Sequence, residues 1–314
     1  MLPPSPDPSE DRRGMAAALA AAIIYGAAYP ATAVALRSFS PLAVAGLSCT
    51  LALVVVTTLA AANVLARPSF DGMSAPRLVR LTVLSLLGGI VFIAGINAAV
   101  AIAGPTITGF VAPLYAIFGT LFAVPLLGER VRPTTIVAFG LALVGTALLA
   151  GAVPAGAPVL GIALALGAAA MFGLYLVLAR RWGVRYRLDG TLVTIANLIG
   201  RGPILLLAAA LLDRSAVIPA DPDPAAVLAI LTLVFGSSTS GNLLLMAAVR
   251  RIPAGRASAA LLVTPVSSAV IAAVVLGDRL SPLGLVGAAC ILVGMAVGSG
   301  LLSVRPLSRA TSPR

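Results

Sequence analysis

The stretch Leu127-Gly128-Glu129-Arg130-Val131-Arg132-Pro133 returns 149 residues later as Leu276-Gly277-Asp278-Arg279-Leu280-Ser281-Pro282. Each stretch ends one long apolar segment and begins another. The match continues downstream, where Leu143–Ala147 aligns with Leu292–Ala296, and upstream, where Ala98–Val100 aligns with Ala247–Val249. The sequence therefore predicts two copies of one structural unit.

The composition indicates a membrane protein. Of the 314 residues, 60% are hydrophobic and 10% are charged, whereas a soluble domain carries about 25% charged residues. A helix needs roughly 20 apolar residues to cross the hydrocarbon core of a bilayer. The chain is long enough for ten such helices, so we expect an all-α membrane protein with ten transmembrane helices.

Proline, glycine and arginine mark the turns between the apolar segments and so set the boundaries of the expected helices. The predicted organisation is a disordered tail at 1–14, a five-helix repeat at 15–151, a second five-helix repeat at 158–303 and a tail at 304–314. The predicted spans are 15–36, 42–65, 80–102, 106–127, 134–151, 158–179, 191–212, 225–248, 256–276 and 283–303.

The arginines predict the orientation. With the N-terminus in the cytoplasm, 17 arginines fall at cytoplasmic segments and 3 at the other side, a strong positive-inside bias. Both tails are then cytoplasmic. Because five spans per repeat is an odd number, the two repeats are inverted relative to each other, an arrangement found in many transporters. The net charge of +11 is thereby explained by membrane topology, and we expect no nucleic-acid partner.

The repeated turn, with a proline upstream and another directly after it, resembles the drug/metabolite transporter superfamily, in particular its EamA-like family. The second copy carries the pattern at Pro265, Leu276–Arg279 and Pro282. The first copy carries Leu127–Arg130 and Pro133, but its upstream proline, Pro113, is displaced by one helical turn. An arginine that often opens the second span of such proteins is replaced here by Ser48.

The resemblance implies a ten-helix carrier with a central cavity. The third, fourth, eighth and ninth helices would line that cavity together with the first and sixth. The fifth and tenth helices would be peripheral, and the seventh would lie away from the centre of the cavity.

The charges within the spans limit the possible mechanisms. No Asp or Glu lies inside a span and the chain has no His, so the usual residues of an intramembrane proton relay are missing. Arg201 is the one charged residue at mid-span, and burying it costs at least about 2.5–3.5 kcal/mol. It shares a helical face with Thr191, Thr194 and Asn197, and it either binds an anionic group of the substrate or serves a structural role.

Polar and aromatic residues inside other spans are further candidates for substrate binding. In the eighth span a run of small hydroxylated residues, with Ser238 and Asn242 as the strongest candidates, indicates either a loosened cavity-lining helix or close helix packing. Pro113 and Pro265 are predicted helix breaks, which are equally compatible with a site and with simple kinks. The other candidates are Tyr25, Tyr29, Asn97, Tyr115, Tyr175, Thr264 and Ser267.

These features predict a secondary transporter that moves a small metabolite, such as an amino acid or a related polar organic compound, or a drug. We expect efflux or exchange by alternating access in a bacterial inner (plasma) membrane; an uptake permease and a non-transport assembly subunit are the alternatives. The sequence offers no nucleophile–base pair and no metal-ligand cluster, so we expect no enzyme activity, cofactor or metal. It does not identify the substrate, the direction of transport or a coupling ion, and it leaves a homodimer unassigned.

Overall fold

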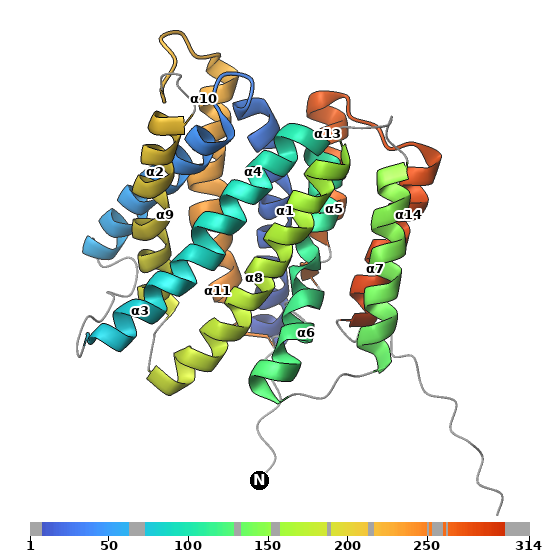
Figure 1. Cartoon of the computed structure of the whole chain (residues 1–314), viewed down its shortest axis with the longest axis horizontal. Helices are drawn as coiled ribbons and strands as arrows, with labels where there is room; N and C mark the ends of the chain where they lie inside the picture. Colours follow the sequence, from blue (N-terminus) through green and yellow to red (C-terminus); the bar gives the residue numbers. More distant parts are fainter. Residues whose placement is uncertain are drawn as a thin grey trace, which may run out of the picture.

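The chain folds into tilted helices that stand side by side (Figure 1). The computed structural model describes residues 8–62, 73–128, 133–151, 158–186, 190–212, 217–249, 251–252, 260–261 and 263–298. The predicted tail at 304–314, the turn Glu129–Arg132 and the predicted beginning of the ninth span at 256–259 lie outside the described residues.

Each of the ten predicted spans contains a helical segment among the described residues. In the first repeat they are α1 (Pro8–Ala35), α2 (Pro41–Ala61), α3 (Ala75–Leu84) with η1 (Ser85–Val91) and α4 (Phe92–Ala103), α5 (Pro105–Val111) with η2 (Ala112–Leu114) and α6 (Tyr115–Leu127), and α7 (Pro133–Gly151). In the second repeat they are α8 (Pro158–Tyr186), α9 (Gly190–Leu212), α10 (Pro224–Leu231) with η3 (Thr232–Gly241) and α11 (Asn242–Val249), α13 (Val263–Leu276), and α14 (Pro282–Gly298).

Among the described residues, seven continuous helical spans are long and apolar enough to cross a membrane, and three apolar helices are shorter. The shorter ones are the stretches Ile136–Leu148, Val263–Leu276 and Pro282–Val297. The outer surface carries large apolar side chains such as Leu212, 71% exposed, and Val274, 81% exposed. An apolar surface of this kind suits lipid rather than water, as the composition predicts.

The first helix begins earlier than expected. We predicted a disordered tail up to residue 14, but α1 already begins at Pro8, so the prediction was wrong for residues 8–14. Proline is favoured at the first helical position because it lacks an N–H that would have no partner there. Glu10 and Asp11 in the first turn also complement the positive end of the helix dipole.

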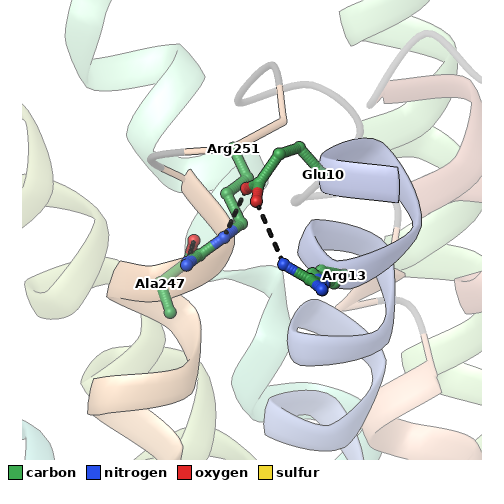
Figure 2. A network of polar contacts seen from close by, with 4 residues as sticks. All are labelled: Glu10, Arg13, Ala247 and Arg251. Atoms are coloured by element: carbon green, nitrogen blue, oxygen red, sulfur yellow. Dashed lines mark hydrogen bonds and ion pairs between the residues drawn. The ribbon is translucent and has the colours of Figure 1, made fainter. Parts of the chain in front are cut away.

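A small ionic network holds this first turn against the end of α11 (Figure 2). Glu10 accepts a hydrogen bond from Nε of Arg251 at 2.9 Å and pairs with Nη1 of Arg13 at 3.4 Å. Arg251 also donates to the carbonyl of Ala247 at 3.0 Å. These groups are partly exposed to solvent, so we assign the network at most about 1 kcal/mol.

The glycine of the repeated turn ends a helix in both copies. Gly128 has φ of 72° and Gly277 has φ of 70°, the left-handed conformation that only glycine adopts without strain. Gly128 follows α6 as its cap and donates its N–H to the carbonyl of Val124 at 3.0 Å. Pro133 and Pro282 then open α7 and α14. The duplicated motif is therefore a helix-stop and helix-start signal in both repeats.

The two repeats interlock through equivalent contacts. The first helix of each repeat packs against the third and fourth spans of the other: α1 against η3, α11 and α13, and α8 against η1, α4 and α6. The second helices, α2 and α9, pack together, and so do the fifth helices, α7 and α14, which stand side by side in Figure 1. Each contact has a counterpart with the repeats exchanged, which is consistent with inverted repeats.

Glycines allow the closest of these helix contacts. A Cβ atom on Gly26 of α1 would lie 2.7 Å from the carbonyl oxygen of Thr264 and 2.9 Å from the amide nitrogen of Ser268 in α13. A Cβ on Gly145 of α7 would lie 2.5 Å from the carbonyl oxygen of Gly287 in α14. Small residues bring membrane helices together in this way and maximise their van der Waals contact.

The third span of each repeat contains a π-helical segment at the same place. With the repeat offset of 149 residues, η1 (Ser85–Val91) aligns with 234–240, which lies inside η3 (Thr232–Gly241). Such segments are rare, and they often occur at functional sites. The polar run of the eighth span therefore has π-helical geometry, and the first repeat contains an equivalent segment that the sequence did not reveal.

Candidate substrate site

Three predicted residues come together where α1 meets the eighth span. The hydroxyl of Tyr25 donates a hydrogen bond to Oδ1 of Asn242 at 2.8 Å, although the two residues are 217 positions apart. Nδ2 of Asn242 donates to the carbonyl of Ser238 at 3.0 Å. A Cβ on Gly241 would lie 2.9 Å from the ring of Tyr25. At the end of η3, Tyr25 of the first repeat thus contacts the side-chain amide of Asn242 in the second repeat.

Ser238 takes part in this contact through its backbone, and its neighbours in η3 bond within their own helix. The Ser237 hydroxyl donates to the carbonyl of Leu233 at 3.1 Å. Thr239 is buried, and its hydroxyl has no hydrogen-bond partner among the described residues. An unsatisfied hydroxyl in a π-helical segment is available to a bound polar group.

Thr264 and Ser267 lie at the neighbouring contact of α1 with α13. The hydroxyl of Ser267 donates to the carbonyl of Thr264 at 2.9 Å and lies 3.4 Å from the carbonyl of Ala22 in α1. The adjacent Ser268 is fully buried, and its hydroxyl has no partner among the described residues. The contact between α1 and α13 is therefore closely packed and contains hydroxyl groups that could change hydrogen-bond partners.

Aromatic rings form a row between the two repeats. The Phe172 ring of α8 lies 4.3 Å from Phe92, 5.0 Å from Tyr115 and 5.1 Å from Tyr175, measured between ring centroids. Such separations are typical of favourable aromatic pairs. The sequence indicated Tyr115 and Tyr175 as candidates but not Phe92, which lies in α4 and carries no polar group.

The aromatic row connects with the tyrosines of α1. A Cβ on Gly109 of α5 would lie 3.6 Å from the Tyr29 ring of α1 and 2.4 Å from Oγ of Ser268 in α13. Tyr29 also packs with Phe92 against one buried apolar cluster. Tyr29, one turn after Tyr25 in α1, therefore links the aromatic row to the Tyr25–Asn242 contact.

The far end of the row reaches Arg201. Nδ2 of Asn197 in α9 donates to the hydroxyl of Tyr175 at 3.2 Å, and Arg201 lies one turn further along α9. Tyr175 and Arg201 can lie close to η1 because this segment has glycines where they meet it. A Cβ on Gly88 would lie 2.5 Å from the Tyr175 ring, and a Cβ on Gly89 would lie 3.3 Å from Cβ and Cδ of Arg201. The side chains of Thr191 and Thr194, predicted on the same face, lie outside the described part of the structure.

Asn97 has a different environment from the other candidates. Its side chain is buried in α4, and Nδ2 donates to the carbonyl of Pro41, the first residue of α2, at 3.3 Å. It joins two helices of the same repeat, whereas the Tyr25–Asn242 contact joins helices of different repeats. Its geometry is that of a structural contact.

The two predicted helix breaks differ in kind. Pro113 lies in the short 3₁₀ segment η2, which divides the fourth span into α5 and α6. Pro265 lies in the first turn of α13. The carbonyl of Leu261, which a residue with an N–H would reach from position 265, instead accepts the Thr264 N–H at 3.0 Å. The missing N–H of Pro265 therefore leaves the carbonyl of Leu261 with a hydrogen-bond partner.

A cavity of about 530 Å³ lies away from these residues, between α3 and the end of α8. It is lined by Ala75, Pro76, Val79, Arg80, Val83 and Trp182. The Arg80 guanidinium lies 3.7 Å from the centroid of the Tyr186 ring and donates to the hydroxyl of that residue at 2.8 Å. Trp182 and Tyr186 carry amphipathic rings of the kind that is favoured at a membrane interface.

The described residues contain no group of three or more His, Cys, Asp or Glu side chains that could hold a metal ion. The described acidic residues are Glu10, Asp11, Asp221, Asp223 and Asp278, and each lies at a helix end or in a connection. Among the described residues away from the span ends, the polar side chains are therefore hydroxyls, amides and the guanidinium of Arg201.

Comparison with known proteins agrees with this architecture. The sequence profile of the EamA-like transporter family matches residues 12–151 and 159–299, so each repeat matches one EamA domain. A search of curated proteins finds no match.

A solved structure described only as "Crystal structure of protein" superposes with a TM-score of 0.65 at 23% sequence identity. The match covers 92% of this chain and 96% of that one, and it shows the fold alone. Because the family profile covers nearly the whole sequence, the chain belongs to the EamA-like transporter family of the drug/metabolite transporter superfamily, a family of membrane transporters rather than enzymes.

Proposed function

We propose that this transporter is a secondary carrier that exports or exchanges a small polar organic compound, such as an amino acid or a related metabolite. The observation that carries the proposal is the meeting of polar and aromatic side chains from both repeats, centred on the Tyr25–Asn242 hydrogen bond. A substrate bound between inverted repeats becomes accessible from each side in turn when the repeats rock against each other.

The residues around this contact suit the uncharged polar groups and the apolar or aromatic part of a small molecule. Tyr25, Tyr29 and Tyr115 supply hydroxyl donors and acceptors, and Asn242 supplies an amide. Phe92 and Phe172 supply apolar surface. Binding sites for small molecules commonly combine such a mainly apolar wall with a few polar groups.

The helix breaks in this region support movement. The first helix contains Pro30, the fourth span changes to 3₁₀ geometry at Pro113, and the third and eighth spans contain the π-helical segments. Helices bend at such points. Spans that meet the candidate site therefore contain the features at which a rocking motion would bend them.

Substrate exchange is favoured over proton coupling. The spans contain no Asp, Glu or His, the residues that normally carry protons through a membrane protein. We therefore expect the substrate gradient, or a counter-moving substrate, to drive transport.

The proposed setting is a bacterial inner membrane with both termini in the cytoplasm, from the distribution of arginines. Reporter fusions test this orientation. Green fluorescent protein fused after residue 314 is expected to fluoresce, whereas alkaline phosphatase fused there is expected to be inactive, since it needs the periplasm. Fusions at residue 219, in the connection between α9 and α10, should give the opposite result; the reverse pattern at both sites would contradict the orientation.

Transport itself can be tested before the substrate is identified. Metabolites in cells and in medium are compared with and without the gene, and compounds that change are offered to proteoliposomes containing the purified protein. We expect at least one small polar compound to accumulate outside cells that express the gene and to exchange across the proteoliposome membrane. Accumulation inside cells would favour an uptake permease, and exchange no faster than in empty liposomes would contradict a carrier.

A further inference from the structure

Unsatisfied polar atoms gather where α9 packs against η1. Oγ of Ser85, Oδ1 of Asn197 and Nε of Arg201 are buried and have no hydrogen-bond partner among the described residues. Ser85 and Asn197 are only 5% and 8% exposed. Buried polar atoms normally have partners, so three unpaired atoms at one helix contact require an explanation.

The three residues share one small region. Asn197 and Arg201 are four positions apart and therefore lie on the same face of α9. A Cβ on Gly200 would lie 2.1 Å from Oγ of Ser85, and Gly89, four positions after Ser85, lies against Arg201 and the carbonyl of Asn197. The hydroxyl of Tyr175 completes the group through its hydrogen bond with Asn197.

The arginine is held deep in the membrane region and is directed at a neighbouring helix. Arg201 is 11 residues from each end of α9 (Gly190–Leu212), which is about 16 Å at 1.5 Å per residue. Its Cβ and Cδ lie against Gly89 of η1, so the aliphatic part of the side chain follows the helix contact. This placement argues against a side chain that extends to the membrane surface.

The chain supplies no carboxylate for this guanidinium within the membrane. No Asp or Glu occurs between positions 190 and 212 or inside any other predicted span, and the described acidic residues lie at helix ends or in connections. Arg201 is partly buried and its Nε is fully enclosed, and a charge at this depth in a membrane without a counter-charge is unfavourable. An anionic group delivered by the substrate would remove this cost and would also satisfy the polar atoms around it.

We infer that Ser85, Asn197 and Arg201, with Tyr175, form a binding site for the carboxylate of a small organic anion. The guanidinium presents paired N–H donors that match a carboxylate, and Ser85 adds a hydroxyl donor. The rings of Tyr175 and Phe172, 5.1 Å apart, provide an apolar surface for the rest of the molecule. This inference rests on the proposed transport function and narrows its substrate class to carboxylates.

Benzoate and benzamide test the site because they have nearly the same shape and differ in charge. We expect benzoate to raise the melting temperature of the purified protein in detergent at constant ionic strength, and benzamide to have no such effect. Arg201→Gln should weaken benzoate binding by about tenfold or more. Arg80→Gln, which removes a peripheral arginine, should leave the response unchanged.

A second variant distinguishes loss of the binding site from misfolding. Asn197→Asp places a carboxylate on the same helical face as Arg201, so it should fold well and yet lose the response to benzoate. Equal responses to benzoate and benzamide, or an unchanged benzoate response in both Arg201→Gln and Asn197→Asp, would overturn the inference. Metabolite exchange by proteoliposomes is measured on the same preparations. Exchange without a benzoate response would contradict the anion site but not the transport function. A benzoate response without any exchange would contradict the transport function but not the anion site.

Discussion

Replacing Gly26 by alanine is expected to lower the stability of the protein by about 2–3 kcal/mol, and replacement by valine to prevent folding. The new Cβ would lie 1.9 Å from Oγ of Ser267, and that side chain can rotate away. The same Cβ would also lie 2.7 Å from the carbonyl oxygen of Thr264 and 2.9 Å from the amide nitrogen of Ser268. These are backbone atoms, so α13 as a whole must move away from α1.

The matched control is Gly167→Ala in α8. A Cβ at that position would meet nothing within 4 Å, and alanine is the better helix former by roughly 1 kcal/mol. Thermal unfolding in detergent should therefore show a melting temperature lower by several degrees for Gly26→Ala and an equal or higher one for Gly167→Ala. Equal melting temperatures for the two variants would mean that α1 and α13 do not pack as closely as described.

Disrupting the Tyr25–Asn242 pair is expected to abolish most of the transport. Tyr25→Phe removes the donor and Asn242→Leu removes the acceptor, and each change leaves a partner unsatisfied at a cost of about 1–3 kcal/mol. If the pair also binds substrate, each single variant should lose transport by about tenfold or more, since a lost interaction of 1.4 kcal/mol corresponds to a factor of ten.

The double variant separates binding from structure. With both polar groups replaced by apolar groups of similar shape, the double variant should be more stable than either single variant, because neither residue of the pair then faces an unpaired group of the other. Transport should stay low, because neither group is available to the substrate. Tyr186→Phe, at the peripheral contact with Arg80, should transport normally. A double variant that regains both stability and transport would assign the pair a structural role only.

The fold was predictable because its signals are local. Apolar runs of membrane-spanning length, prolines such as Pro133 and Pro282, and the repeated glycine turn fix each helix independently of its neighbours. The beginning of α1 was missed because Glu10, Asp11 and the arginines after them read as a polar tail. The ion pair between Glu10 and Arg251 also stabilises the helical conformation of these residues.

The site was predictable only as a set of residue types on separate helices. Nothing in the sequence indicates that Tyr25 meets Asn242, or that Asn97 meets the carbonyl of Pro41, because these pairings depend on how the helices pack. The segment η1 was missed because Gly88 and Gly89 carry no polar side chain. Their role is to leave room for Tyr175 and Arg201, which only the packed structure reveals.

Counterflow in proteoliposomes tests the central claim most directly. Vesicles are loaded with a compound identified by the metabolite comparison, ionophores remove any pH difference and membrane potential, and a trace of the same compound carrying an isotope label is added outside. We predict rapid transient uptake of the label that depends on the internal compound and causes no pH change inside the vesicles. Uptake equal to that of empty liposomes, or uptake only when a proton gradient is imposed, would contradict an exchanger whose site lies between the two repeats.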